Sequence, residues 1–214
     1  MLVALGGRAV LAEFPELCGV EQQLIDRCEN TILASRFLKL MQDFERSAID
    51  AGSGFDMNPS PGNIKDGLIT DAMKSAGAAK KGGAAPITGV LDYTEYCHNQ
   101  GLHLLCTPGN DVESTTALVG SGCNLVAFTT GLGTPTGNPA APVIKMSSNN
   151  NLAQKMKDII DFNAGDIITG KESIEDAADR LLSFLVDVAS GRIQTQTDKN
   201  QQFDFIPWKR GVSL

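Results

Sequence analysis

Apolar residues follow a helical period in two long parts of the chain. Between residues 31 and 51 they recur at spacings of three and four, which predicts an amphipathic helix that ends at the glycines of residues 52–54. A second stripe, ending near residue 190, follows Ser173, and Asp176 three residues later is typical of a capped helix start. Shorter helices are predicted at residues 20–28, 67–76, 113–119 and 152–157.

Short apolar runs between these helices predict strands. They cover residues 8–14, 87–93, 102–106, 125–128 and 143–146, with a briefer run at 159–160. The runs lack the alternating polar positions of a strand with one wet face, so we expect both faces to be covered. Strands that alternate with helices are typical of an α/β fold with a mostly parallel sheet and helices on both faces.

Polar residues follow several of these strands. In an open parallel sheet, ligands bind beyond the carboxyl ends of the strands, so these residues are expected to share one edge. Their carboxylate, amide and hydroxyl oxygens suit Mg²⁺, Ca²⁺, Mn²⁺ or Fe²⁺, and a cation there would hold a hydroxy acid by its carboxylate and α-hydroxyl. The residues are Glu13, Thr107 to Asp111, Thr129 to Gly131, Ser147 to Asn149 and Asp161 to Asn163.

Residues 58–63, with the sequence NPSPGN, are predicted to form a shaped loop. Two prolines and a glycine disfavour both a helix interior and a central strand. Such a loop would present Asn58, Ser60 and Asn63 to a ligand with little ordering cost. The alternative is a rigid connector between two helices.

Two other features change the list of candidate chemistries. Residues 131–137 are rich in glycine after a strand, but their spacing is G-x-G-x-x-x-G and Pro135 prevents an immediate helix, so we reject a dinucleotide site. Lys81, which precedes two glycines, is either a solvated surface lysine or a partly desolvated one that acts as a base or holds a carboxylate. His98 and His103 have no partner at metal-ligand spacing.

Composition limits the compartment and the partners. The 214 residues fit a single domain, 1–214, because no linker divides them. A net charge of -7 without a basic block argues against nucleic acid, and no apolar run reaches the length of a membrane span. The first residues lack the basic flank of a signal peptide and the five cysteines include no C-x-x-C pair, so we expect a cytoplasmic protein without disulfides.

Several strings resemble the altronate and galactarate dehydratase family, and together they cover essentially the whole chain. The ending resembles the altronate branch in particular. The resemblance implies the carboxyl-terminal portion of a longer enzyme, built as a variant Rossmann-like three-layer sandwich. The strings are residues 12–16 with Gly19 and Glu21, residues 58–63, residues 81–83, Thr107-Pro108 with Asp111, residues 128–131 with Gly133, Asp161 with Asn163 and Gly165, and residues 205–211.

The reaction implied by this resemblance is dehydration of altronate to 2-keto-3-deoxygluconate. A base removes the proton α to the carboxylate, a divalent metal stabilises the enediolate, and an acid assists departure of the β-hydroxyl. Fe²⁺ is the expected metal, with Mn²⁺ next and Ca²⁺ or Mg²⁺ as other occupants. We assign the metal to Glu13 and Asp111, which also count as catalytic, and Lys81 to the base or carboxylate anchor. The substrate-binding candidates are Asn58, Ser60, Asn63, Thr107, Thr129, Thr130 and Asn149.

Other functions remain open. Galactarate dehydration and elimination of sulfite from sulfolactate use the same α-proton chemistry with another acid. Outside enzymology, the chain would be a sugar-acid or metal-binding module that is inactive without its N-terminal domain, or a subunit interface. The expected partners are a small sugar acid, the N-terminal β domain of the longer enzyme and a second copy in a homodimer.

Overall fold

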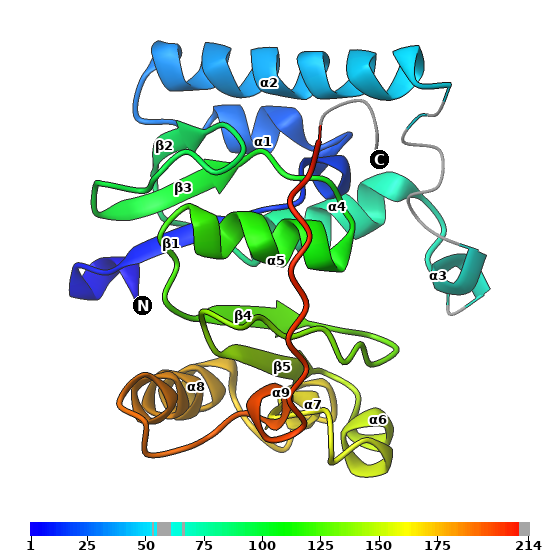
Figure 1. The fold of residues 1–214 in the computed structure, drawn as a ribbon, viewed down its shortest axis with the longest axis vertical. Helices are drawn as coiled ribbons and strands as arrows, with labels where there is room; N and C mark the ends of the chain where they lie inside the picture. The colour runs from blue at the N-terminus through cyan, green and yellow to red at the C-terminus, as the bar shows by residue number, and fades with distance from the viewer. Residues whose placement is uncertain (53, 55–60, 66, 210–214) are drawn as a thin grey trace. The chain divides into compact units, whose positions relative to one another are not determined.

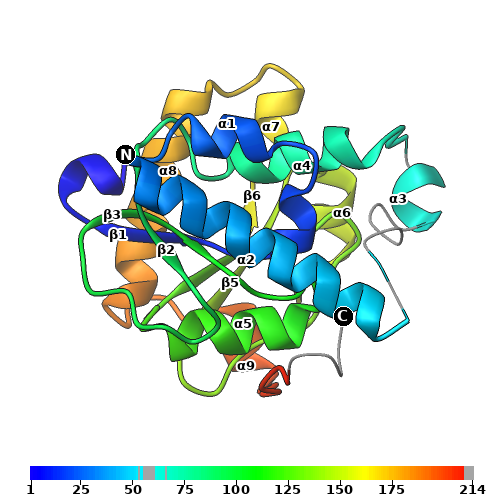
Figure 2. The same ribbon diagram turned by 90° about the horizontal axis from the view of Figure 1, so that it is seen from above.

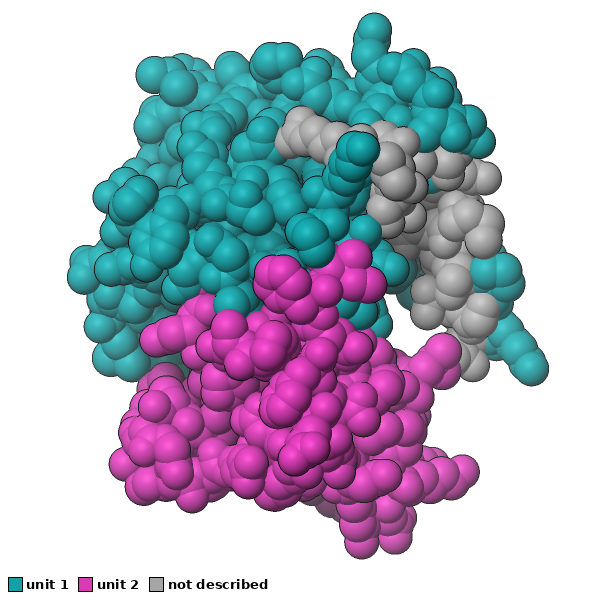
Figure 3. Space-filling view, in the orientation of Figure 1, with its two compact units in different colours: residues 1–122, 207–214 teal, residues 123–206 magenta. Residues whose placement is uncertain are grey.

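The computed structural model describes residues 1–52, 54, 61–65 and 67–209. The chain divides into two compact units, one made of residues 1–122 with the end of the chain from Pro207, the other of residues 123–206 (Figure 3). Each unit contains a three-stranded parallel sheet and helices, which confirms the predicted α/β class. The strands are shared between two sheets, and the single-domain organisation of residues 1–214 stays a prediction.

The sheet of the first unit has the strand order β1-β3-β2. Its strands are β1 (Arg8–Leu11), β2 (Ile87–Leu91) and β3 (Gly101–Leu105). Both outer strands run parallel to β3, which therefore lies in the centre and is buried along its whole length. Val90 of β2 pairs with Leu104, and both side chains belong to the main core of this unit.

Helices of the first unit lie on both sides of its sheet, with α2 (Thr31–Asp50) on one side and α5 (Asp111–Gly120) on the other (Figures 1 and 2). The predicted stripe of α2 faces the core through Phe37, Leu40, Met41, Phe44 and Ala48, whereas Ile32, near the helix start, is 77% exposed. The remaining helices are η1 (Val3–Leu5), η2 (Phe14–Leu17), α1 (Glu21–Ile25), α3 (Pro61–Lys65) and α4 (Asp71–Lys80).

Several predicted boundaries in this unit differ from those of the structure. The first strand ends at Leu11 instead of continuing to residue 14, because the backbone turns at Glu13 into η2. Helix α4 runs past Gly77 to Lys80 and begins at Asp71, where Thr70 caps it by accepting a hydrogen bond from Met73 N. Residues 61–63 belong to α3, whose first residue is a proline, a position where the missing N–H costs nothing.

The sheet of the second unit has the order β4-β5-β6 and is also parallel. Its strands are β4 (Val126–Thr129), β5 (Val143–Ser147) and β6 (Phe162–Asn163), so the run predicted at 159–160 becomes a strand three residues later. Its helices, which Figure 1 shows on one side of β4 and β5, are α6 (Asn150–Lys155), α7 (Gly165–Ile168), α8 (Ile174–Ala189) and α9 (Gln196–Lys199).

The strongest helix of the second unit starts as predicted. Ser173 Oγ accepts a hydrogen bond from Asp176 N at 3.0 Å, and its hydroxyl lies 2.7 Å from the Asp176 carboxylate. Val188 of this helix packs with Ile144 and Phe162 in the core of the unit. Among the described helices of the chain, none is long and apolar enough to cross a membrane.

Candidate active site

The first unit holds Glu13 in an unusual backbone conformation between β1 and η2. Its φ of 71° and ψ of 67° lie in the left-handed region, which residues other than glycine seldom adopt. Glu13 N donates to Thr107 Oγ1 at 2.9 Å, and Phe14 N donates to the Thr107 carbonyl oxygen at 3.2 Å. Backbone strain that the surroundings hold in place is common at functional sites, so this turn is the centre of the candidate site.

Thr107, which follows β3, anchors this turn from the interior. Its side chain has no exposed surface, and Oγ1 lies 3.0 Å from the Pro108 carbonyl oxygen and 3.1 Å from Ser114 Oγ on α5. A buried hydroxyl with these partners cannot touch a substrate unless the site rearranges. In this structure Thr107 supports Glu13, and its predicted contact with substrate stays a prediction.

The Glu13 carboxyl favours its protonated form. Burial is the main cause, and the neighbouring Glu16 carboxylate adds to it by repulsion and by a side-chain hydrogen bond, so that the pKa of Glu13 rises to about 8. Asp111 raises the pKa further, whereas the positive charge of Lys81 lowers it. Glu13 is therefore the carboxyl group of this pair that holds a proton at neutral pH.

Glu16 has a second partner that the sequence did not single out. Lys74 Nζ of α4 lies 2.8 Å from Glu16 Oε1, and both side chains are about one-fifth exposed. This ion pair links η2 to α4 beside the Glu13 carboxyl. No local signal identifies Lys74, because the pair depends on how α4 packs against η2.

Lys81 and Asp111 complete the group around Glu13, and each lies at the end of a helix. Lys81 follows α4 and is exposed, so it is not the partly desolvated lysine that the sequence allowed. Asp111 is the first residue of α5, which begins two residues earlier than predicted because Asn110 Oδ1 accepts hydrogen bonds from Val112 N and Glu113 N. The structure thus brings Lys81 and Asp111 within electrostatic reach of Glu13, the third predicted catalytic residue.

The donor set for a metal ion is incomplete. Within the described residues, no three His, Cys, Asp or Glu side chains come close enough to hold a metal. Glu13 and Asp111 by themselves do not fit a resident divalent ion, which in proteins takes more oxygen ligands. The predicted Fe²⁺ site stays a prediction.

The other substrate-binding candidates belong to the second unit or to residues 58–63. Thr129, predicted to follow a strand, is the exposed last residue of β4. Thr130 Oγ1 accepts a hydrogen bond from Gly133 N at 2.9 Å and shapes the next turn. Asn149 Oδ1 caps α6 by accepting from Asn151 N and Leu152 N. Asn58 and Ser60 lie outside the described residues, as does the side chain of Asn63. Substrate contacts of all these residues stay predictions.

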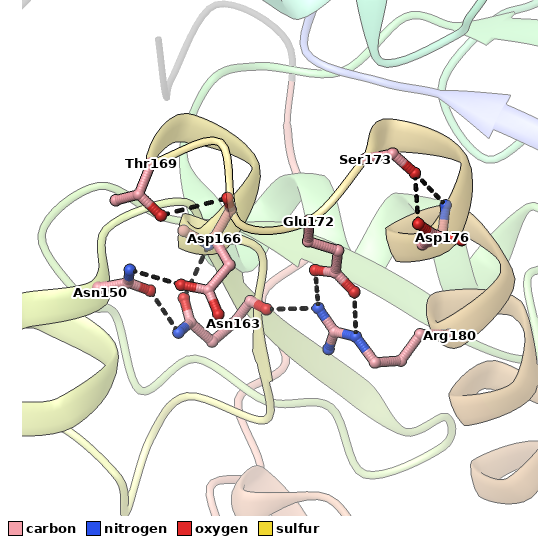
Figure 4. Close-up of polar contacts among 9 residues, drawn as sticks. Asn150, Asn163, Asp166, Thr169, Glu172, Ser173, Asp176 and Arg180 are labelled. Atoms are coloured by element: carbon pink, nitrogen blue, oxygen red, sulfur yellow. Dashed lines mark hydrogen bonds and ion pairs between the residues drawn. The ribbon is translucent and has the colours of Figure 1, made fainter.

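Asn163 and its neighbours form a closed polar network in the second unit (Figure 4). Asn163 Nδ2 donates to Asn150 Oδ1 at 2.6 Å, and Asn150 Nδ2 donates to Asp166 Oδ1 at 3.0 Å. Arg180 pairs with Glu172 and donates to the Asn163 carbonyl oxygen at 3.0 Å. Because these polar groups bond to one another, the network joins β6 to the starts of α6 and α7.

Asp161, which is half-buried, and Lys145, which is buried, have different roles in the second unit. The Asp161 carboxylate accepts from Lys145 N and Gln196 N, both at 2.7 Å, and so ties the start of α9 to β5. Burial raises its pKa, while these two backbone hydrogen bonds oppose the rise. Lys145 is fully buried, with Nζ 3.6 Å from the centre of the Phe128 ring. The sequence pattern gave no sign of this lysine, which lies within an apolar run.

Known proteins with similar sequences are sugar-acid dehydratases and a sulfo-lyase. Altronate dehydratases of Escherichia coli (strain K12) and Bacillus subtilis (strain 168) are 38% and 37% identical over 213 residues, 100% of this chain and 42% of each relative. Galactarate dehydratase (L-threo-forming) of Escherichia coli (strain K12) is 36% identical over 93% of the chain and 38% of that protein. The beta subunit of (2R)-sulfolactate sulfo-lyase from Chromohalobacter salexigens is 32% identical over 87% of the chain and 49% of that subunit.

The family comparison agrees with these relatives. The model of the family described as D-galactarate/altronate dehydratase, C-terminal, matches residues 1–213. The chain spans less than half the length of the curated relatives named above. The match over nearly every residue confirms the resemblance seen in the sequence strings. This chain belongs to the D-galactarate/altronate dehydratase family and corresponds to its C-terminal part.

Proposed function

We propose that this chain is the catalytic-type domain of a sugar-acid dehydratase that converts altronate to 2-keto-3-deoxygluconate and water. The observation that carries the proposal is the arrangement around Glu13, where a carboxyl group in a strained turn faces Glu16 and lies near Lys81 and Asp111. Two carboxyl groups in different environments beside a cation supply an acid, a base and a carboxylate anchor, which is what this elimination needs.

Lys81, Glu16 and Glu13 have separate roles in the elimination. Lys81, exposed and positively charged, holds the carboxylate of the substrate. Glu16 accepts the proton from the carbon next to that carboxylate, and the electron pair forms a carbon–carbon double bond as the β-hydroxyl leaves. Glu13 gives its proton to the departing hydroxyl, so water forms. The enol then tautomerises to the 2-keto acid, and the proton taken by Glu16 restores Glu13 through their hydrogen bond.

We propose altronate as the substrate, in preference to the other acids, because the altronate dehydratases align with more of the chain than the other relatives do. The two altronate dehydratases align with the whole chain, whereas the galactarate dehydratase and the sulfo-lyase subunit align with 93% and 87% of it. All three reactions begin with removal of an α-proton, so the Glu13 group would serve each of them. Galactarate dehydration is therefore the second candidate.

The test is product formation by the 214-residue chain. Altronate, galactarate and sulfolactate are each incubated with the protein, with and without added Fe²⁺ or Mn²⁺, and products are followed by proton NMR and sulfite detection. We expect 2-keto-3-deoxygluconate from altronate. Glu13→Gln should lower its rate at least about 100-fold, because the amide cannot supply the proton. Glu45→Gln, an exposed carboxylate on α2, is the matched control and should not change the rate.

Three outcomes would change the proposal. Turnover of galactarate or sulfolactate in place of altronate would change the substrate but keep the chemistry. Binding of altronate without turnover, measured by calorimetry, would favour a sugar-acid binding module. Equal rates in wild type and Glu13→Gln would show that Glu13 is not the acid.

A further inference from the structure

Trp208, in the segment that returns to the first unit, is inserted into the core of that unit. Its side chain is 7% exposed and its ring centre lies 5.2 Å from that of Tyr93 and 5.1 Å from that of Phe44. The Tyr93 and Trp208 rings meet edge to face, an arrangement that aromatic pairs prefer. The segment is therefore anchored by packing as well as by its backbone.

The Tyr93 hydroxyl connects this segment to α5. Trp208 N donates to Tyr93 Oη at 2.6 Å, and Oη in turn donates to the Glu113 carbonyl oxygen at 3.3 Å. Because Trp208 N can only donate, its bond leaves the single hydroxyl hydrogen directed at Glu113. Glu113 lies in the first turn of α5, two residues after Asp111 and one before Ser114.

The first turn of α5 also supports Glu13, through Thr107. Ser114 Oγ lies 3.1 Å from Thr107 Oγ1, and Thr107 Oγ1 accepts the hydrogen bond from Glu13 N. A continuous series of contacts thus runs from Trp208 through Tyr93 and the first turn of α5 to the strained turn at Glu13. It joins four segments that are distant in the sequence and that all belong to the first unit.

We infer that Tyr93 is a positioning residue for the candidate active site, which it serves by holding the first turn of α5 and, through Ser114 and Thr107, the backbone of Glu13. The expected effect of Tyr93 on catalysis rests on the proposed function. Its expected effect on the Glu13 backbone does not. The backbone N–H of Trp208 fixes the direction of the Tyr93 hydroxyl.

The experiment compares Tyr93→Phe with Phe44→Leu in the full chain. Tyr93→Phe keeps the ring and removes both hydrogen bonds, whereas Phe44→Leu loosens the packing on Trp208 and leaves the hydroxyl in place. Amide hydrogen exchange at Glu13 reports on the far end of the contact series. Steady-state kinetics with altronate, and the thermal midpoint, are measured on the same samples. Ser114→Ala breaks a later link and is the second variant.

With Tyr93→Phe, exchange of the Glu13 amide should become at least about 5-fold faster, and Ser114→Ala should do the same. For altronate, kcat should fall about 10-fold in Tyr93→Phe with KM within about 2-fold, since the groups that bind substrate remain. Phe44→Leu should lower the thermal midpoint but leave Glu13 exchange and kcat close to wild type.

Two results would overturn the inference. One is unchanged Glu13 exchange in both Tyr93→Phe and Ser114→Ala. The other is an equal loss of kcat in Tyr93→Phe and Phe44→Leu, which would reflect stability alone. If wild type does not turn over altronate, the proposed function fails, and the exchange rates by themselves decide the role of Tyr93.

Discussion

At the scale of single residues, Glu13 combines a left-handed backbone with a carboxyl group whose charged form is disfavoured. Neither feature is a property of glutamate itself. The turn is held by Thr107, and the preference for the protonated carboxyl comes from burial and from Glu16. A residue so constrained has a cost in stability, and that cost is measurable as a function of pH.

The stability of the wild type relative to Glu13→Gln should fall as pH rises. The pKa of Glu13 is raised from 4.5 to about 8, so between these values the folded chain binds a proton that the unfolded chain releases. The wild type is therefore most favoured below pH 4.5 and loses this contribution as pH approaches 8. We expect urea unfolding at pH 5 and pH 8.5 to show a change of about 1 kcal/mol or more in the difference between the two proteins.

The matched control for this measurement is Glu45→Gln, because Glu45 is exposed on the surface of α2. Its stability difference from the wild type should be nearly the same at both pH values. A Glu13→Gln difference that is equally independent of pH would mean that the folded chain does not hold the carboxyl in its protonated form.

At the scale of elements, the pairing of β2 with β3 depends on a close approach at Gly89. A Cβ at this position would collide with the imidazole of His103, the residue opposite it in the register. His103 is buried, and burial lowers its pKa, so its neutral ring is part of the core. Glycine is therefore required here for space between two strands.

Gly89→Ala should accordingly destabilise the chain by about 1–3 kcal/mol, the usual cost of overpacking. Gly109→Ala is the control, since a Cβ at Gly109 would meet no atom within 4 Å. Thermal unfolding of both variants checks the expectation. Equal midpoints for the two variants would show that β2 and β3 can separate to admit a methyl group at no cost.

Asn149 tests whether a helix cap also binds substrate. Asn149→Ala removes the cap of α6 and should cost about 1 kcal/mol, whereas Asn149→Ser retains a capping oxygen and should restore most of that stability. If Asn149 also binds the sugar acid, Asn149→Ser should still raise KM for altronate. Full recovery of both stability and KM by serine would limit the residue to its capping role.

At the scale of the whole molecule, the sequence predicted the fold class but not its division. Periodicity identified the strands and the long helices α2 and α8, because a strong stripe of apolar residues is a local signal. The separation into two sheets has no such signal, since the connection near residue 123 looks like any other loop. Strand pairing and the choice of partners depend on packing that one sequence does not display.

The candidate site shows the same limit. Glu13, Lys81 and Asp111 were identified from strand ends and from family strings, and the structure places them in one group. Lys74 was missed because its pairing with Glu16 joins α4 to η2, and Tyr93 was missed because Trp208, its partner, lies 115 residues away. Thr107 was found, but its burial and its hydrogen bonds could not be read from its type.

Metal content is the remaining prediction at this scale. If Glu13 and Asp111 are ligands, the other ligands must be groups other than a third His, Cys, Asp or Glu of the described residues, since those gather no set of three. Elemental analysis after loading with Fe²⁺ or Mn²⁺ should then show bound metal that falls at least about 2-fold in Asp111→Ala and not in Glu45→Gln. Equal metal in all three proteins would remove Asp111 from the ligand list.

The return of Pro207 and Trp208 to the first unit has a consequence for biosynthesis. During translation, residues 1–122 and then residues 123–206 emerge from the ribosome before Trp208 does. Until then, the ring contacts that Trp208 makes with Phe44 and Tyr93 are absent from the nascent chain. Domains usually fold in the order of their synthesis, but of these two units the one that comes earlier in the chain is completed second.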